Sequence, residues 1–512
     1  MTNMKTSHVL AIFVAVLCCI RSQSLASTPN VIVIYTDDQG FGDMSCQNAD
    51  AKFKTPNLDR IAAEGIRFTN AHSSDTVCTP SRYGLLTGRY CWRTRLKRGV
   101  MGAEGRCLIA DGRTTIPSML RDNGYQTAMI GKWHLGMDFP GDPGSRDWTK
   151  PVKDMPLDKG FDYFFGVPAS LNYGVLAWFE GRFAKVPPTV FTNKKPNKRH
   201  VDYRIKPPYQ ESPEATRRAI GTKGMEVAPD FVDNECLERF TNEAIVWLKE
   251  KRDPTKPFCL YLPMTSPHYP VCPRKEFWNQ GDCGGYGEFM IETDHRVGQI
   301  LEFLKTANLE QNTLLVFTSD NGPEKSYKKR IEEFKHDSRG GWKGGKRDIY
   351  EGGHRVPFLV RWPQGIKSPG RVCDALVGQI DLLATIAEIT ETKVSVKHAE
   401  DSHSFAKILS HPDYQHQRLP LINHGVQGRF AITDGQWKLI MPFRNLKREL
   451  YNLAADPQEE KNVYANNLEI AKKLETKLTK IVLDGRTTDG PKQSNDTGYW
   501  DHLTWIDKTD YK

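Results

Sequence analysis

Short runs of apolar, often β-branched residues recur along this chain, and each is followed by polar residues and then by a helix-like pattern. The clearest runs are 31–35, 127–130, 258–262 and 314–317. The helix-like stretches include 57–64, 116–123, 236–251 and 289–306. Parallel strands that are buried on both faces read as continuous apolar runs, and they alternate with helices along the chain. We therefore predict an α/β fold, in which helices sandwich a large, mostly parallel β-sheet.

This pattern stops after a helix-like stretch at 381–390. Two apolar runs, 430–433 and 437–441, then lie on either side of an Asp-Gly turn, which is typical of a hairpin, and a helix-like stretch follows at 468–483. We predict three parts: a signal peptide at 1–26, a large α/β domain at 27–395, and a small C-terminal α+β domain with antiparallel strands at 396–512.

The N-terminus has the features of a secretory signal peptide. A short apolar run, 9–20, follows Lys5 and ends before the small residues of Ser24-Leu25-Ala26. An N-terminal anchor helix is the alternative, but no apolar run reaches the roughly 18–20 residues that span a bilayer. We therefore expect a secreted or periplasmic protein without a membrane span.

Charge limits the partners of the mature chain. Loss of residues 1–26 removes two basic residues and no acidic ones, which lowers the formal net charge from +9 to +7. Such an excess can steer an anionic substrate.

The basic run at 194–200 is more typical of a solvated face, because no nucleic-acid motif accompanies it. The G-x-x-x-x-G-K sequence at 340–346 lacks the Ser or Thr that a nucleotide loop needs next. We expect no nucleic-acid partner.

The segment from about 138 to 230 differs from the rest of the chain, because it is rich in proline, glycine and aromatic residues. Loops of this length in a compact domain are usually functional or disordered. We predict that the segment forms long loops laid over one edge of the sheet.

Four polar clusters directly follow predicted strands. They are Asp37-Asp38, Lys132 with His134, His268, and Asp320-Asn321. In open α/β sheets the ligand crevice lies outside the carboxyl ends of the strands, so these clusters should meet at one site. Each also has a structural alternative, such as a turn, a helix cap or a hydrogen-bonded histidine. Three carboxylates and an amide are hard oxygen ligands, which suit Ca²⁺ or Mg²⁺ better than Zn²⁺.

The sequence Cys78-Thr79-Pro80-Ser81-Arg82 begins a predicted helix. Thr79 is an acceptable cap and Pro80 suits the first helical turn, which places Cys78 at the helix N-terminus. Backbone amides there favour an oxyanion such as sulfate or phosphate, and Arg82 offers a planar fork for one. A structural cysteine beside a capped helix is the alternative.

Cys-x-Pro-Ser-Arg followed by Leu-x-Thr-Gly-Arg, at 78–89, resembles the modification motif of type I, formylglycine-dependent sulfatases. These arylsulfatase-like enzymes are a branch of the alkaline-phosphatase superfamily. Further matches to this family follow one another in order over most of the mature chain. They are 37–43 and 318–322 for the metal, 131–136 and 266–268 for the catalytic lysine and histidines, 346 with 351–353 for a second lysine, and 449–453 near the C-terminus.

The resemblance implies a sulfuric ester hydrolase and a role for each matched residue. A formylglycine-generating enzyme would oxidise Cys78 to formylglycine during maturation. Arg82 and Lys132 would hold the hydrated aldehyde and the sulfate. His134 would take a proton from the hydrate, and His268 and Lys346 would contact the leaving group. The implied ligands of a Ca²⁺ ion, with Mg²⁺ as the second choice, are Asp37, Asp38, Cys78, Asp320 and Asn321. Asp43 is expected outside this ligand set.

The aromatic segment 161–183 lies between the Lys132/His134 cluster and the expected sheet edge. Aromatic faces can stack on sugar rings, so we expect a sulfated carbohydrate substrate, with galactose or N-acetylgalactosamine as the first candidates. Packing of these aromatics on the core is an equal alternative. The expected substrate contacts are Asn172, Trp178 and Arg182.

Two other functions and one cysteine pairing stay open at this point. The same scaffold could hydrolyse phosphate or phosphonate esters, or Cys78 could remain a thiol in an inactive glycan-binding relative. The mature chain has nine cysteines, an odd number that needs an explanation in an exported protein. Cys259 could be a buried thiol. Conversion of Cys78 would leave eight cysteines, and Cys272 with Cys283 is the best local pair among them.

Overall fold

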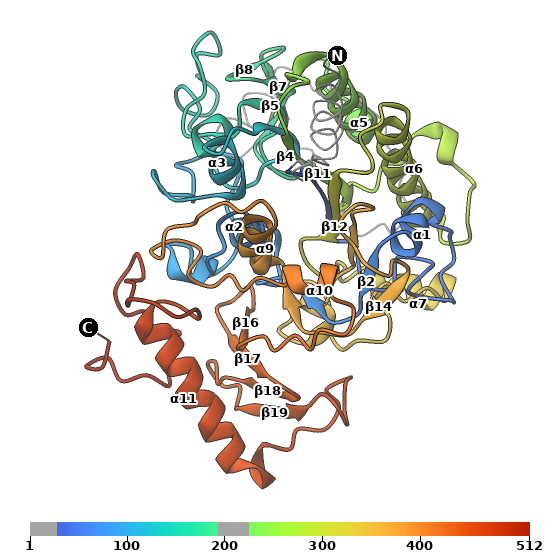
Figure 1. Ribbon diagram of the computed structural model, residues 1–512. Helices are drawn as coiled ribbons and strands as arrows, with labels where there is room; N and C mark the ends of the chain where they lie inside the picture. The colour runs from blue at the N-terminus through green and yellow to red at the C-terminus, as the bar shows by residue number, and fades with distance from the viewer. Residues whose placement is uncertain (1–27, 193–224, 512) are drawn as a thin grey trace, which may run out of the picture.

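The computed structural model describes residues 28–192 and 225–511. The predicted signal peptide at 1–26 and the basic run at 194–200 lie outside the described residues. One ten-stranded sheet runs through the larger part of the molecule (Figure 1). From one edge to the other, its strands are β14 (Arg371–Cys373), β2 (Ile66–Phe68), β13 (Phe358–Arg361), β12 (Thr313–Ser319), β1 (Asn30–Asp37), β11 (Phe258–Pro267), β4 (Gln126–Lys132), β5 (Tyr163–Val167), β7 (Phe179–Glu180) and β8 (Phe183–Ala184).

The centre of the sheet is parallel. Strands β12, β1, β11, β4 and β5 pair in parallel with their neighbours, whereas β13 and β7 pair in antiparallel fashion on either side. Every residue of β11 and β12 is buried, which explains why these strands read as continuous apolar runs. The predicted α/β fold with a mostly parallel sheet is therefore confirmed.

The segment from 138 to 230 is more regular than we predicted from its composition. Within its described residues, β5, β7 and β8 extend the large sheet, and three short strands form a second sheet. These three are β6 (Val175–Leu176), β10 (Met225–Val227) and β9 (Val190–Thr192). Strand pairing satisfies backbone groups at these positions, so the prediction of loops alone was wrong for the residues in these strands.

Helices cover both faces of the sheet (Figure 1). On one face, α1 (Pro56–Ala63) and α5 (Cys236–Val246) pack against the long α6 (Gly284–Thr306). On the other, α2 (Cys78–Thr87) packs against α3 (Ile116–Arg121) and α9 (Leu382–Ile389). In α5 the buried Leu237, Phe240, Thr241 and Ala244 recur every three or four residues, which is the apolar stripe expected of a helix on a sheet.

A smaller C-terminal part comes after the strands of the large sheet in the sequence, and it lies apart from that sheet in Figure 1. Its strands β16 (Leu421–His424), β17 (Phe430–Asp434), β18 (Trp437–Ile440) and β19 (Glu449–Asn452) form an antiparallel sheet. Helix α11 (Leu468–Asp484) packs on this sheet and buries Leu474, Leu478 and Val482. The predicted small α+β part with a hairpin at the Asp-Gly turn is confirmed.

The remaining elements are short. Two more strands, β3 (Ala71–His72) and β15 (Val377–Gly378), pair with each other. The other helices are α7 (Tyr327–Phe334), α8 (Glu351–His354) and α10 (Ala406–Ser410), and a π-helical turn at Trp247–Lys251 continues α5. Short 3₁₀ turns occur at Cys91–Arg93, Pro156–Lys159, Asp233–Glu235, Lys275–Phe277, Gln379–Asp381 and Tyr464–Asn466.

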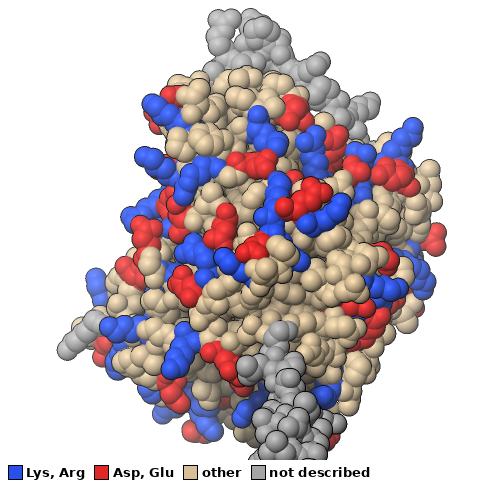
Figure 2. All heavy atoms as spheres, turned by 45° about the horizontal axis from the view of Figure 1, so that its top comes forward, with Lys and Arg blue, Asp and Glu red and all other residues tan. Residues whose placement is uncertain are grey.

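Two properties of the described surface bear on partners. Among the described residues, no helix is both long and apolar enough to cross a bilayer. On the face shown in Figure 2, basic and acidic side chains are interspersed, so the basic excess of the chain is not gathered there into a patch of one sign.

Candidate active site

The carboxyl ends of four adjacent strands bring the polar clusters together. Strands β12, β1, β11 and β4 are neighbours in the sheet and parallel to one another. Asp37 ends β1 beside Pro267 of β11, and Thr36 pairs with Ser319 at the end of β12. The side chains that follow these ends therefore meet above one edge of the sheet, as we expected from their positions in the sequence.

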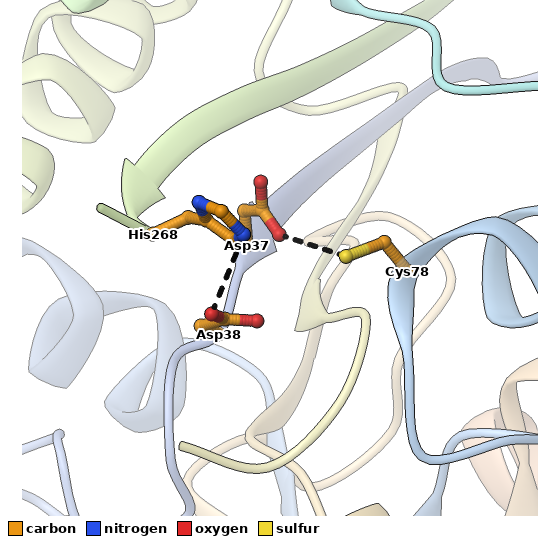
Figure 3. A group of neighbouring side chains, drawn as sticks. All are labelled: Asp37, Asp38, Cys78 and His268. Carbon is orange, nitrogen blue, oxygen red and sulfur yellow. Dashed lines mark hydrogen bonds and ion pairs between the residues drawn. The ribbon is translucent and has the colours of Figure 1, made fainter. Parts of the chain in front are cut away.

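Asp37 lies at the centre of this group and is fully buried. Lys132 binds one of its carboxylate oxygens through a salt bridge. The other oxygen lies 3.5 Å from the Cys78 sulfur (Figure 3) and 3.8 Å from the Arg82 guanidinium. Burial opposes the charge of Asp37, but Lys132, His268 and Arg82 outweigh it and hold the pKa of this carboxyl well below its usual range.

Arg82 contacts residues at the ends of three strands, β12, β4 and β1. Its guanidinium donates to Asp320 at 2.9 Å and to the Lys132 carbonyl at 3.1 Å. Burial and the negative charge of Asp37 raise the pKa of Asp320. The two carboxylates therefore compete for the surrounding positive charge, which is the environment that a bound cation would stabilise.

Cys78 is the first residue of α2, as predicted, but the cap differs from our expectation. Val77 is the N-cap residue and provides no side-chain hydrogen bond. The Thr79 hydroxyl instead donates to the His134 carbonyl at 3.0 Å, so it fixes the loop after β4 and does not cap the helix. Burial outweighs the nearby lysines and raises the pKa of the Cys78 thiol, so a thiolate is disfavoured at this position.

Lys346 lies in the loop before α8 and its side chain contacts the site. Its Nζ donates to both oxygens of Asp38, at 2.6 and 2.8 Å, and to the Cys78 sulfur at 3.7 Å. Asn321 donates to Asp38 at 2.8 Å. Its own oxygen is buried and has no hydrogen-bond partner within the part of the chain that the structure describes.

The two histidines approach from different strands. His268 Nε2 lies 3.8 Å from Asp38, a contact that a dashed line marks in Figure 3, and its Nδ1 lies 2.6 Å from the Tyr269 carbonyl oxygen. His134 contacts the Met101 carbonyl through Nε2 at 3.0 Å, while its Nδ1 is buried without a partner among the described residues. Burial and the nearby Lys346 together lower the pKa of His268 to about 4. Burial and Lys132 also lower the pKa of His134, so both rings are neutral near pH 7.

The donor set suits a hard divalent cation. Ligand atoms of Asp37, Asp38, Cys78 and His268 lie within 4.8 Å of one another. Asp320 accepts a hydrogen bond from the Asp38 backbone, and the Asn321 oxygen, which has no partner in the described part of the chain, is a further neutral ligand atom. Carboxylate and amide oxygens of this kind fit Ca²⁺ or Mg²⁺. Asp43 binds Gly40, Tyr286 and His336, and we leave it outside the proposed ligand set.

The three expected substrate residues have different surroundings. Asn172 is 8 % exposed and donates to the Tyr269 hydroxyl at 3.1 Å, next to His268. Trp178 is fully buried among Phe165, Phe231 and Phe240, so our expectation that it presents a face to sugar is wrong.

Arg182 pairs with Asp158 at 2.9 Å. It lines a surface cavity whose lining includes none of the clustered residues, so the structure does not place it among them.

Two tyrosines at the site were missed by the sequence reasoning. Tyr173 lies with its ring 5.0 Å from that of His134, and Tyr269 stacks on His268 at 4.4 Å. A signal for Tyr269 was available, because it directly follows His268. Tyr173 sits inside the aromatic segment, where nothing in the sequence separates it from the residues that pack in the core.

The predicted cysteine pair does not form. All nine described cysteines are free thiols. The surroundings of Cys272 and Cys283 differ, because Cys272 interacts electrostatically with Asp233 and Cys236, whereas Cys283 interacts with Arg330 and Asp43. Cys259 is buried in β11, as its apolar sequence context suggested.

A second group of potential metal ligands lies between the two parts of the chain. His72, Glu351 and His354 are buried and close together. Their ligand atoms are already occupied, because Lys438 of β18 contacts Glu351 and His354 at 3.0 Å and Arg355 donates to Glu351 at 2.9 Å. This group has one carboxylate, against three in the active site, and both oxygens of Glu351 already pair with cations, so we interpret the group as a buried hydrogen-bond network.

Comparisons with known proteins agree with these observations. A family model described as Sulfatase matches residues 29–392, and one described as N-sulphoglucosamine sulphohydrolase, C-terminal, matches 340–484. An N-acetylgalactosamine-6-O-sulfatase of Bacteroides thetaiotaomicron is 31% identical over 88% of this chain and 93% of its own. Human arylsulfatase A is 29% identical over 92% of this chain and 91% of its own.

Solved structures lead to the same family. A structure from work on the metabolism of multiple glycosaminoglycans by Bacteroides thetaiotaomicron matches with a TM-score of 0.76 and 29% identity, covering 89% of this chain and 99% of that one. With the family model spanning most of the chain and a sulfatase as a relative over nearly its full length, the chain belongs to the sulfatase family of the alkaline-phosphatase-like superfamily and is a sulfuric ester hydrolase.

Proposed function

We propose that this sulfatase is exported and removes sulfate from a sulfated glycan, with 6-O-sulfated N-acetylgalactosamine as the first candidate. The predicted signal peptide supports export, to a secreted or periplasmic location. The 31% identical relative acts on N-acetylgalactosamine 6-O-sulfate by its name, and the structure with a TM-score of 0.76 comes from work on glycosaminoglycans. Galactose sulfate is the second candidate, because the two sugars share a ring configuration.

The position of Cys78 carries this proposal. Its sulfur lies at the N-terminus of α2, between Asp37 and Lys346, within a sulfatase modification motif. We propose that the formylglycine-generating enzyme of the host converts Cys78 to formylglycine. Once hydrated, that group would supply one hydroxyl to attack sulfur and a second whose deprotonation would restore the aldehyde and expel sulfate. A buried thiol with a raised pKa supplies neither.

The residues around Cys78 would then position the ester and move protons. Arg82 and Lys132 place two positive charges beside the nucleophile, where they would stabilise the sulfate oxygens. Asp37, Asp38, residue 78, Asp320 and Asn321 would hold Ca²⁺, or less favourably Mg²⁺, which would add positive charge at the same place.

Two histidines and a lysine would transfer protons or contact the leaving group. Neutral His134, whose Nδ1 has no hydrogen-bond partner within residues 28–192 and 225–511, would accept the proton that leaves the second hydroxyl. Lys346 and His268 both contact Asp38; protonated Lys346 would assist departure of the sugar oxygen, and neutral His268 would contact that oxygen. We also propose that the boundary between the catalytic and C-terminal domains lies at residues 395/396.

Two measurements test it. Mass spectrometry of the peptide around residue 78, from protein made in a host with the modifying enzyme, should show the aldehyde. Purified enzyme should release sulfate from N-acetylgalactosamine 6-sulfate and leave the matching phosphate ester intact. An unmodified thiol in active protein would contradict the formylglycine mechanism. Modified protein that hydrolyses aryl sulfates but no sulfated sugar would contradict the glycan assignment.

A further inference from the structure

The entrance side of the active site contains two aromatic rings that the proposed mechanism does not use. Tyr173 comes from the loop between β5 and β6, and Tyr269 from the loop after β11. Both are partly exposed, whereas Asp37, Lys132 and His134 behind them are fully buried. These rings are therefore the parts of the group that a bulky substrate can reach.

Each ring lies against one of the two histidines. The Tyr173 ring is tilted by 58° against His134 at 5.0 Å, and the Tyr269 ring stacks on His268 at 4.4 Å with an interplanar angle of 29°. Burial and the neighbouring Cys78 raise the pKa of the Tyr173 hydroxyl, and Lys346 lowers it, so this ring lies within electrostatic reach of the nucleophile. Tyr269 lines a small cavity together with Asp38 and Glu324.

Asn172 connects the two loops. Its amide nitrogen donates to the Tyr269 hydroxyl at 3.1 Å, and the residue is 92 % buried. The amide oxygen is buried and has no hydrogen-bond partner among the described residues. A buried acceptor without a donor is costly, and a ligand hydroxyl or amide could satisfy it.

We propose that Tyr173, Tyr269 and Asn172 form the binding subsite for the pyranose ring that carries the sulfate. The two rings would offer apolar faces to the sugar, and the Asn172 oxygen would accept a hydrogen bond from a ring substituent. This inference rests on the proposed glycan substrate and names the residues that would recognise it. It moves the aromatic recognition that we expected of Trp178 to two other residues.

Binding can be measured without turnover in a Cys78→Ala background. We expect calorimetry to detect binding of N-acetylgalactosamine 6-sulfate or galactose 6-sulfate to this variant. Adding Tyr173→Ala should weaken the dissociation constant at least 10-fold, and adding Tyr269→Phe should weaken it about 3- to 10-fold, because the hydroxyl that holds Asn172 is lost. Adding Tyr414→Ala, a surface tyrosine that is 41% exposed, is the matched control and should leave it unchanged.

The outcomes are distinguishable from those of the proposed function, which is tested by sulfate release from the wild type. Binding of neither sugar to Cys78→Ala, or equal affinity in the Tyr173→Ala and Tyr414→Ala variants, would overturn the subsite. If Tyr173→Ala alters folding, its melting temperature will fall, and the Tyr269→Phe result then decides, because that change preserves the ring.

Discussion

Lys346 binds both carboxylate oxygens of Asp38 and lies 3.7 Å from the sulfur of Cys78. One ammonium group therefore contacts a proposed metal ligand and the residue that would carry the nucleophilic hydroxyl after conversion. Asp38 raises the pKa of Lys346 against the opposing effect of burial, so the side chain remains protonated near neutral pH. This position suits a group that stabilises or protonates the leaving oxygen when the sulfate ester bond breaks.

Replacement of Lys346 should therefore slow chemistry more than binding. We expect Lys346→Met to lower kcat about 100-fold or more on a sugar sulfate, with a smaller loss on an activated aryl sulfate, whose leaving oxygen needs less protonation. Steady-state kinetics on both substrates provide the measurement. Lys343→Met is the matched control, because Lys343 lies on the same loop but donates to the Glu459 carbonyl at 2.7 Å. Equal losses on the two substrates would contradict a leaving-group role.

The metal proposal makes a separate prediction. Asp320→Ala should abolish activity, because Asp320 holds Arg82 and belongs to the proposed ligand set. Exhaustive chelation of the wild type should remove activity, and added Ca²⁺ should restore it more fully than Mg²⁺. Asp282→Ala changes an exposed aspartate and serves as the control. Full activity in chelated protein with no metal detectable would remove the claim.

The sequence was sufficient for the parts of the site that follow strands. Buried parallel strands such as β1 and β12 are continuous apolar runs, so their ends, and hence Asp37 and Asp320, could be located without coordinates. The aromatic segment could not be resolved in this way. Trp178 and Tyr173 have the same chemical character, and only tertiary packing makes one a core residue and the other a neighbour of His134. Lys438 and Glu351 are far apart in sequence and belong to no strand-end pattern, so their contact could not be predicted from the sequence.

Lys438 should be important for stability because it joins the two parts of the chain. It is fully buried and lies 3.0 Å from Glu351 and 2.8 Å from Glu459. Removing one partner of a buried ion pair typically costs about 3–5 kcal/mol, because the remaining charges stay buried. We expect Lys438→Met to lower the melting temperature strongly. Lys477→Met removes a surface pair with Asp434 and should have little effect. Similar shifts in both variants would contradict this view.

The same network predicts a dependence of stability on pH. Burial lowers the pKa of His72 to about 3, whereas an unfolded histidine titrates near 6.5. Between these values the unfolded chain binds the extra proton, so this contribution to stability is complete above about pH 6.5 and is lost as the pH falls, by at most about 1.4 kcal/mol per pH unit. Melting curves between pH 5 and 8 should show a shallower dependence in His72→Gln. The exposed His411→Gln should keep the wild-type slope, and identical slopes in all three proteins would contradict the assignment.

Trp178 distinguishes packing from substrate recognition in the aromatic segment. Its ring is parallel to Phe165 within 4°, lies 4.7 Å from Phe231, and has the Arg239 guanidinium 4.7 Å above it. Truncating a buried aromatic residue to alanine typically costs about 3–5 kcal/mol, so Trp178→Ala should lower the melting temperature markedly. Phe183→Ala, at a residue of the same segment that is 47% exposed, should change it little. At a temperature where Trp178→Ala is still folded, its ratio of kcat/KM values for sulfated sugar and aryl sulfate should equal that of the wild type. A selective loss on the sugar would mean that Trp178 reaches the substrate after all, and that the buried packing described above changes when the glycan binds.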